Sequence, residues 1–142
     1  MEANSVEDSA QLRQLVTDWF ASVTRGDGSL IQRHVAMDPR TRLVGSDPAE
    51  WLQGGSAIAT FLRGEVDGSG GVATFTPSET EAYEEGSVGW AATKLTISFP
   101  DGRSISPRWT AVFHREGDVW KFVQTHASIA IPNDEVGWTY DS

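Results

Sequence analysis

Histidine is the side chain best suited to moving protons near neutral pH, and one of the three histidines in this sequence lies near the middle of a predicted strand. Residues 120–129, Trp-Lys-Phe-Val-Gln-Thr-His-Ala-Ser-Ile, alternate and are rich in β-branched and aromatic residues, with His126 near the middle. An imidazole that faced a water-poor cavity there could remove or deliver a proton. A strand histidine with satisfied ring nitrogens gives the same pattern, so the residue types allow both roles.

Other reactive patterns are missing from the sequence. It contains no cysteine, which excludes thiolate nucleophiles, disulfides and cysteine-type zinc sites. The three histidines lack the spacing of a metal site, so we expect no metal and no cofactor. The long strands predicted in the second half carry no Asp or Glu between their turns. A carboxylate could come from Asp18, Asp47 or Glu50, although a solvated or capping role is the favoured interpretation for each.

Charge and length narrow the class of protein. The chain has 142 residues and a net charge of −9, from 20 acidic and 11 basic residues. Such a chain repels phosphate backbones and anionic lipid headgroups, so we expect neither nucleic acid nor membrane as a partner. The length is typical of one domain, predicted over residues 1–142. The first ten residues are acidic and polar, unlike a signal peptide, and we expect a cytoplasmic protein.

The first half of the chain has the period of helices. Apolar residues at i, i+3, i+4 and i+7 spacing predict a long helix over residues 6–25 that is capped by Ser5. The buried stripe of this helix comprises Leu12, Leu15, Val16, Trp19, Phe20 and Val23. Shorter helices are predicted over residues 29–37 and 56–64, with a short strand at 41–44. Trp51 follows on a single turn, from which it could close a cavity as a lid.

From residue 72 the period changes to two, which predicts a four-stranded antiparallel meander. Glycine-containing turns recur at residues 85–86, 101–102 and 116–117. The last three strands are long, and long strands in an open sheet twist and curl. Helices followed by a curled sheet predict an α+β fold, in which a curved antiparallel sheet wraps a long N-terminal helix and two shorter helices.

Two-residue loops at these turns would determine which side chains share a face of the sheet. One face would then carry Trp90, Lys94, Trp109, Phe113, Trp120, Phe122, Gln124 and His126. The other face would carry Leu95, Ile97, Arg108, Thr110, Val112, Val123, Thr125, Ala127 and Ile129. A bulge would break this register, and a three-residue loop at 116–118 would exchange the faces of the last strand. Lys94, Gln124 and His126 would be costly in a dry core, which favours a partly wet pocket on the aromatic face.

Several segments resemble the SnoaL-like branch of the nuclear transport factor 2-like (NTF2-like) superfamily over nearly the whole chain. They are "TDWFASVTRGD", "GSDPAEWLQGG", "EGSVGWAA", "PRWTAVFHREGDVWKFVQTHASI" and "IPND". The resemblance implies a cone-shaped sheet around the first helix, a ligand cavity in the cone and a back-to-back sheet dimer. It implies no single activity, because proteins similar to this fold include isomerases, cyclases, dehydratases, hydrolases and association domains.

Three functions fit these features. The favoured hypothesis is a binding protein for a small apolar or aromatic ligand, with pocket residues Trp19, Trp51, Trp90, Lys94, Trp109, Phe122, Gln124 and His126. The second is a cofactor-independent lyase, isomerase or hydrolase in which His126 transfers a proton. The third is a dimeric association domain with a vestigial pocket. In each case the flat aliphatic and threonine face predicts a homodimer through the convex side of the sheet.

Overall fold

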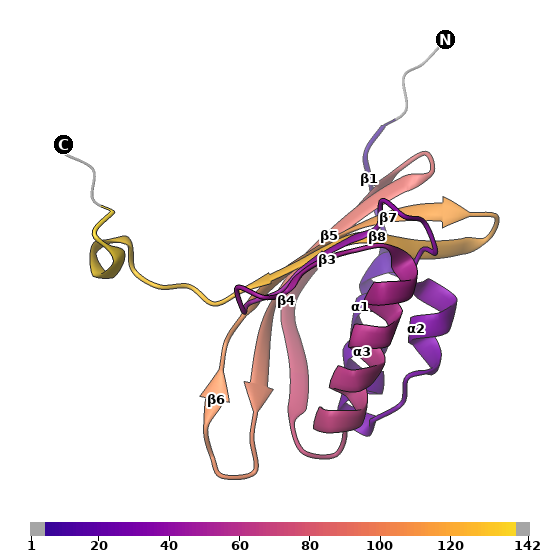
Figure 1. Ribbon diagram of the computed structural model, residues 1–142. Coiled ribbons are helices and arrows are strands. Elements are labelled where there is room, and N and C mark those ends of the chain that lie inside the picture. Colours follow the sequence, from indigo (N-terminus) through magenta and orange to yellow (C-terminus); the bar gives the residue numbers. More distant parts are fainter. Residues whose placement is uncertain (1–4, 139–142) are drawn as a thin grey trace.

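Three helices lie against the concave face of a strongly curved sheet in the computed structural model, which describes residues 5–138 (Figure 1). The helices are α1 (Ala10–Arg25), α2 (Ser29–His34) and α3 (Gly55–Ser69), followed near the C-terminus by the 3₁₀ turn η1 (Asn133–Val136). The strands are β1 (Glu7–Asp8), β2 (Arg42–Val44), β3 (Trp51–Gln53), β4 (Thr74–Glu85), β5 (Val88–Ser98), β6 (Ser104–Ile105), β7 (Arg108–Glu116) and β8 (Val119–Ser128). The predicted α+β cone is confirmed.

Four short strands, β1, β2, β3 and β6, join the predicted meander, and the sheet is mixed because β2 runs parallel to its neighbour. Among the described residues its order is β1-β4-β5-β7-β8-β2-β3, and β6 pairs with β5 outside this path. Strand β2 runs parallel to β8, with Val44 opposite His126, while β3 closes the edge antiparallel to β2. Trp51 therefore lies in an edge strand, and its prediction on a single helical turn is wrong.

Helix α1 starts later than its pattern suggested. Ser9, not Ser5, is the N-cap, and its Oγ accepts a hydrogen bond from the Leu12 amide at 3.2 Å. The same hydroxyl donates to the Glu84 carboxylate of β4 at 2.6 Å, so the cap also fixes the helix to the sheet. The buried stripe is as predicted except that Val23 is only half-buried, and Leu12 and Val16 are completely buried. The helix ends at Gly26, whose φ of 74° is the left-handed conformation of a C-cap.

The hairpin between β5 and β7 has a three-residue loop, and this shifts the predicted register by one residue. The Phe99 amide donates to the Arg103 carbonyl at 2.9 Å, which leaves residues 100–102 as the loop. Thr93 is opposite Trp109 and Lys94 is opposite Arg108, so the predicted pairing of Lys94 with Trp109 is wrong. A one-residue shift turns each side chain to the other face, which moves Trp90 and Lys94 to the convex side.

The last hairpin deviates from the prediction at two places. Glu116 pairs with Val119, so the two-residue loop is 117–118 and not 116–117. Because the loop keeps its length, this first deviation leaves Phe122 on the concave face. A register shift then falls between the Val112–Gln124 and Phe113–Phe122 pairs, which makes Val123 the extra residue of a β-bulge. Beyond the bulge, each β8 side chain points to the face opposite to the one predicted. The prediction that Gln124 and His126 share the concave face is therefore wrong.

Aromatic side chains from α1 and the sheet form the centre of the core. Phe113 is 0% exposed, and its ring lies 4.7 Å from that of Phe122. Phe122 also contacts Trp19 of α1, with ring centroids 4.6 Å apart. These contacts connect α1 to β8 and, through Phe113, to β7, and they place aromatic surface on the inside of the cone.

His34, the last residue of α2, connects that helix to β8. Its Nδ1–H donates to the Trp120 carbonyl at 2.8 Å, because a carbonyl oxygen can only accept. Partial burial is the largest influence on the ring and lowers its pKa from 6.5, although the carbonyl contact acts in the opposite direction. The folded protein therefore favours the neutral imidazole.

Stability should decline on acidification through His34. Its folded pKa is lower than its unfolded value, so below pH 6.5 the unfolded chain takes up a proton that the folded protein resists. We expect the free energy of unfolding to fall as the pH drops from 6.5 to the depressed pKa. Urea denaturation should show a shallower decline for His34→Gln. Equal slopes for the wild type and the variant would contradict this assignment.

The segment after β8 leaves the body of the molecule (Figure 1). It exposes apolar side chains, including Ile131 at 57% and Val136 at 60%. No helix in the described part of the chain is long and apolar enough to cross a bilayer.

Candidate functional site

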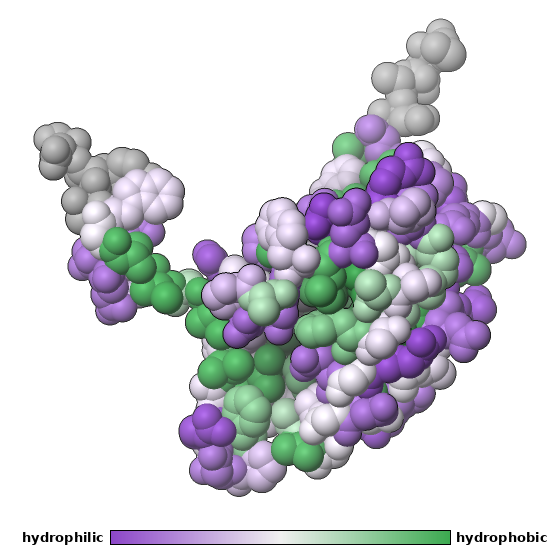
Figure 2. Space-filling model, in the orientation of Figure 1, coloured by the Kyte–Doolittle hydropathy of each residue, from purple (hydrophilic) through white to green (hydrophobic). Residues whose placement is uncertain are grey.

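A cavity of about 260 Å³ lies between α1, α3 and the concave face of the sheet. Its walls are mostly apolar, and they include Trp19, Phe20, Val35, Leu43, Ile58, Phe61, Leu62, Val66, Phe75, Leu95, Ile97, Trp109, Phe122 and Ala127. Figure 2 shows a hollow on this side of the molecule, with hydrophobic residues gathered around it. A concave apolar site with few polar groups is the usual form of a small-molecule site.

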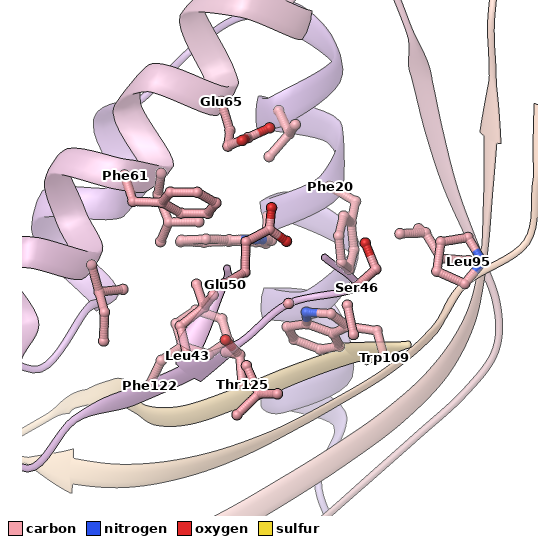
Figure 3. A pocket seen from close by; sticks show the side chains of 18 of the residues that line it. Phe20, Leu43, Ser46, Glu50, Phe61, Glu65, Leu95, Trp109, Phe122 and Thr125 are labelled. Carbon is pink, nitrogen blue, oxygen red and sulfur yellow. The ribbon is translucent and has the colours of Figure 1, made fainter. Parts of the chain in front are cut away.

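Aromatic rings shape the floor of the cavity. Trp109 of β7 is only 7% exposed, and its ring meets Phe20 edge-on with centroids 5.1 Å apart. Phe122 lies 5.9 Å from Trp109, also nearly perpendicular. Phe61 faces them from α3 across the open space (Figure 3). The sheet holds its rings in fixed orientations, so the floor is preorganised.

Glu50 projects into this cavity from the turn between β2 and β3. The Gly45 amide donates to the Glu50 carbonyl at 2.8 Å, and the Asp47 amide donates to Glu50 Oε1 at 3.3 Å. A side chain at Gly45 would place its Cβ 2.6 Å from Glu50 Cβ, so the glycine makes room for this side chain. Glu50 was expected to be solvated or capping. It caps no helix: it accepts the Asp47 amide within its own turn, and its side chain lines the cavity.

Glu65 was not identified from the sequence, because α3 was predicted to end at Gly64. The helix continues to Ser69, and Glu65 lies one turn after Phe61 on the same face. Both carboxylates point into the space between α3 and the sheet (Figure 3). Desolvation raises the pKa of Glu65 above 4.5, and the nearby negative charge of Glu50 raises it further. The sequence signal that could have identified Glu65 was its i, i+4 spacing from Phe61, had the helix been extended past Gly64.

The predicted pocket residues divide into two groups. Trp19, Trp109, Phe122 and Gln124 border the cavity, whereas Trp51, Trp90, Lys94 and His126 do not. Strand alternation places the Gln124 side chain on the outer face, where it is exposed. His126 is also exposed on that face, opposite Thr110 of β7. The predicted position of its ring inside the cavity is wrong.

Three further candidates have partners outside the cavity. Trp51 is 66% exposed, with the Arg42 guanidinium 5.1 Å from its ring centre. Trp90 packs beside Tyr83, with centroids 6.2 Å apart. Lys94 forms an exposed ion pair of 3.0 Å with Glu79.

Within residues 5–138 there is no group of three or more His, Cys, Asp or Glu that could hold a metal ion.

Comparison with known proteins places the chain in a sequence family. The model of the SnoaL-like domain matches residues 12–132. No curated protein matches the chain. An NTF2-like protein of unknown function from Pseudomonas putida KT2440 has a similar structure, with 18% identity, coverage of 94% of each chain and a TM-score of 0.76.

Two other similar structures belong to proteins with different roles. One is a proposed dehydratase of the NTF2-like family from Streptomyces avermitilis, with 18% identity, a TM-score of 0.68 and coverage of 85% of this chain and 94% of that one. The other is the association domain of C. elegans CaMKII, with 15% identity, a TM-score of 0.64 and coverage of 82% and 92%, respectively. At such identities the likeness shows the fold alone.

Proposed function

Because the chain belongs to the SnoaL-like domain family, we propose that it binds a small, largely apolar molecule in the cavity between α3 and the sheet. The observation that carries this proposal is the cavity itself. Its aromatic floor is preorganised, and burying a ligand's apolar surface there contributes about 25 cal/mol for each Å² removed from water. A volume of about 260 Å³ suits a ligand of two or three aromatic rings.

Binding is favoured over the two other functions considered. An enzyme that uses His126 in the cavity has no support from the geometry, since that ring lies on the opposite side of the sheet. A vestigial pocket would be expected to fill with its own side chains, because protein interiors are normally close-packed. Here the space stays open beside Phe61 and Trp109.

Fluorescence of phenylnaphthylamine tests the proposed function. This dye is uncharged and aromatic, and its emission rises in apolar surroundings. We expect saturable binding at one site per chain, with a rise in the thermal unfolding temperature at excess dye. Absence of both saturable emission and a thermal shift would reject the proposal.

A homodimer through the convex sheet face is a separate proposal. Thr125 and Ala127 line the cavity, so the flat aliphatic patch predicted from the sequence is wrong in composition. The convex face instead exposes Trp90, at 36%, opposite Val112 of β7. Exposed tryptophan is enriched in interfaces.

Sedimentation velocity at micromolar concentration should show a dimer. Thr110→Arg places a long cation at the centre of the convex face beside Arg108, so we expect the variant to sediment as a monomer. The matched control is Ser104→Arg, on the exposed strand β6 outside the proposed interface, which should remain dimeric. A wild-type protein that sediments as a monomer would refute the interface.

A further inference from the structure

The cavity has an acidic character that its apolar walls do not explain. Arg42, Glu50 and Glu65 are its ionisable lining residues. The guanidinium of Arg42 is engaged by two β3 residues outside the cavity: it donates to Gln53 Oε1 at 3.2 Å and lies over the Trp51 ring. Its contacts therefore hold the Arg42 guanidinium away from the cavity, whereas the two carboxylates point into it (Figure 3).

Neither carboxylate is neutralised by the protein. Within residues 5–138, Glu50 and Glu65 form no ion pair, and the side chain of Glu65 accepts no hydrogen bond. Glu50 accepts one weak bond from the Asp47 amide. Two like charges that face a shared apolar space repel each other, and this repulsion contributes to the raised pKa of Glu65. A cation between them would remove that cost.

We propose that the cavity selects a hydrophobic amine, whose protonated nitrogen lies between Glu50 and Glu65 while its apolar body contacts the aromatic floor. This inference rests on the proposed function and names the chemical class of the ligand. An ammonium group would give each carboxylate a charge-assisted hydrogen bond, the stronger kind of polar contact.

The surrounding residues suit this class of ligand. The rings of Phe61 and Trp109 border the same space, and aromatic faces attract cations within about 6 Å. The net charge of −9 raises the local concentration of cations and disfavours anions. A neutral ligand of the same shape would give neither carboxylate a cationic partner, and a carboxylate ligand would be repelled.

Acidification should weaken amine binding. The pKa of Glu65 is raised by desolvation and by Glu50, so this group gains a proton at a higher pH than an ordinary glutamate. Once it is protonated, the attraction for an ammonium group is reduced. The affinity for an amine should therefore be full above the raised pKa and fall as the pH drops through it, while that for a neutral isostere should change less.

Calorimetry with three naphthalene derivatives of similar shape tests the proposal. Naphthylmethylamine is cationic at neutral pH, naphthalenemethanol is neutral and naphthoate is anionic. We expect the amine to bind about tenfold or more tightly than the alcohol, and naphthoate to bind weakest. The double variant Glu50→Gln/Glu65→Gln should lower amine affinity to that of the alcohol, and single Glu65→Gln should have part of this effect. Glu116→Gln, exposed at the end of β7, is the matched control and should change nothing.

The outcomes separate this inference from the proposed function. If amine and alcohol bind equally and the double variant alters neither affinity, the cavity binds ligands but does not select cations, and the inference is overturned. If none of the three compounds binds and phenylnaphthylamine also fails, both proposals are rejected. An amine preference that persists in the double variant would also overturn the role of the two carboxylates.

Discussion

Phe113→Ala is expected to lower the free energy of unfolding by about 3–5 kcal/mol, the usual cost of truncating a buried aromatic residue. Phe113 is 0% exposed, and its ring contacts Phe122 at 4.7 Å. Neighbouring strands hold the space around it, so the cavity left by the missing ring could collapse only in part. Chemical denaturation followed by tryptophan fluorescence measures the change, because buried Trp120 lies in the same core cluster.

The neighbouring residue provides the control for that variant. Val112 precedes Phe113 in β7, points to the convex face and is only half-buried. Val112→Ala should therefore cost about 1 kcal/mol or less. Equal losses at the two positions would mean that the faces of β7 are assigned incorrectly.

Ala127→Trp is expected to abolish binding of phenylnaphthylamine while the protein remains folded. Ala127 lies beyond the bulge of β8, where its side chain lines the cavity. An indole at this position would occupy much of the roughly 260 Å³ available. Because it enters open space and not a packed core, the cost in stability should stay near the lower end of the about 1–3 kcal/mol typical of overpacking.

The adjacent Ser128→Trp is the matched control for cavity filling. Ser128 is opposite Arg108 and follows Ala127 on the other face of β8. The same side chain added there should leave dye fluorescence at the wild-type level. If Ala127→Trp still binds the dye with unchanged affinity, the dye occupies another site and the cavity is not the binding site.

Features with a local cause could be predicted from the sequence. The stripe of α1 has a helical period, and five of its six predicted residues are buried: Leu12, Leu15, Val16, Trp19 and Phe20. The alternation in β7 correctly placed Trp109 and Phe113 inside. Both patterns depend on residues that are neighbours along the chain.

Loop length and bulges caused the errors in the predicted site. A glycine marks a turn, but it does not determine whether the loop has two or three residues, and the three-residue loop after β5 moved Trp90 and Lys94 outward. The bulge at Val123 has no signature in composition, yet it moved His126 outward and Ala127 inward. The loop reverses the predicted face of every paired β5 residue, and the bulge reverses that of every β8 residue after Val123.

The two cavity carboxylates show a different limit. Glu50 and Glu65 come from a turn and a helix, and only tertiary packing brings them to the same space. The spacing of these two residues along the chain matches neither a helical nor a strand period, so it does not predict that they are neighbours. Gly45, which leaves room for the Glu50 side chain, also has no evident role until the turn is seen folded.

A crystal structure of the protein soaked with phenylnaphthylamine tests the central claim most directly. We predict density for the dye between α3 and β7, in contact with Trp109 at the floor of the cavity and with Phe61 on the opposite wall. An empty cavity at saturating dye, or dye bound at another surface alone, would contradict the proposal that this cavity is the functional site.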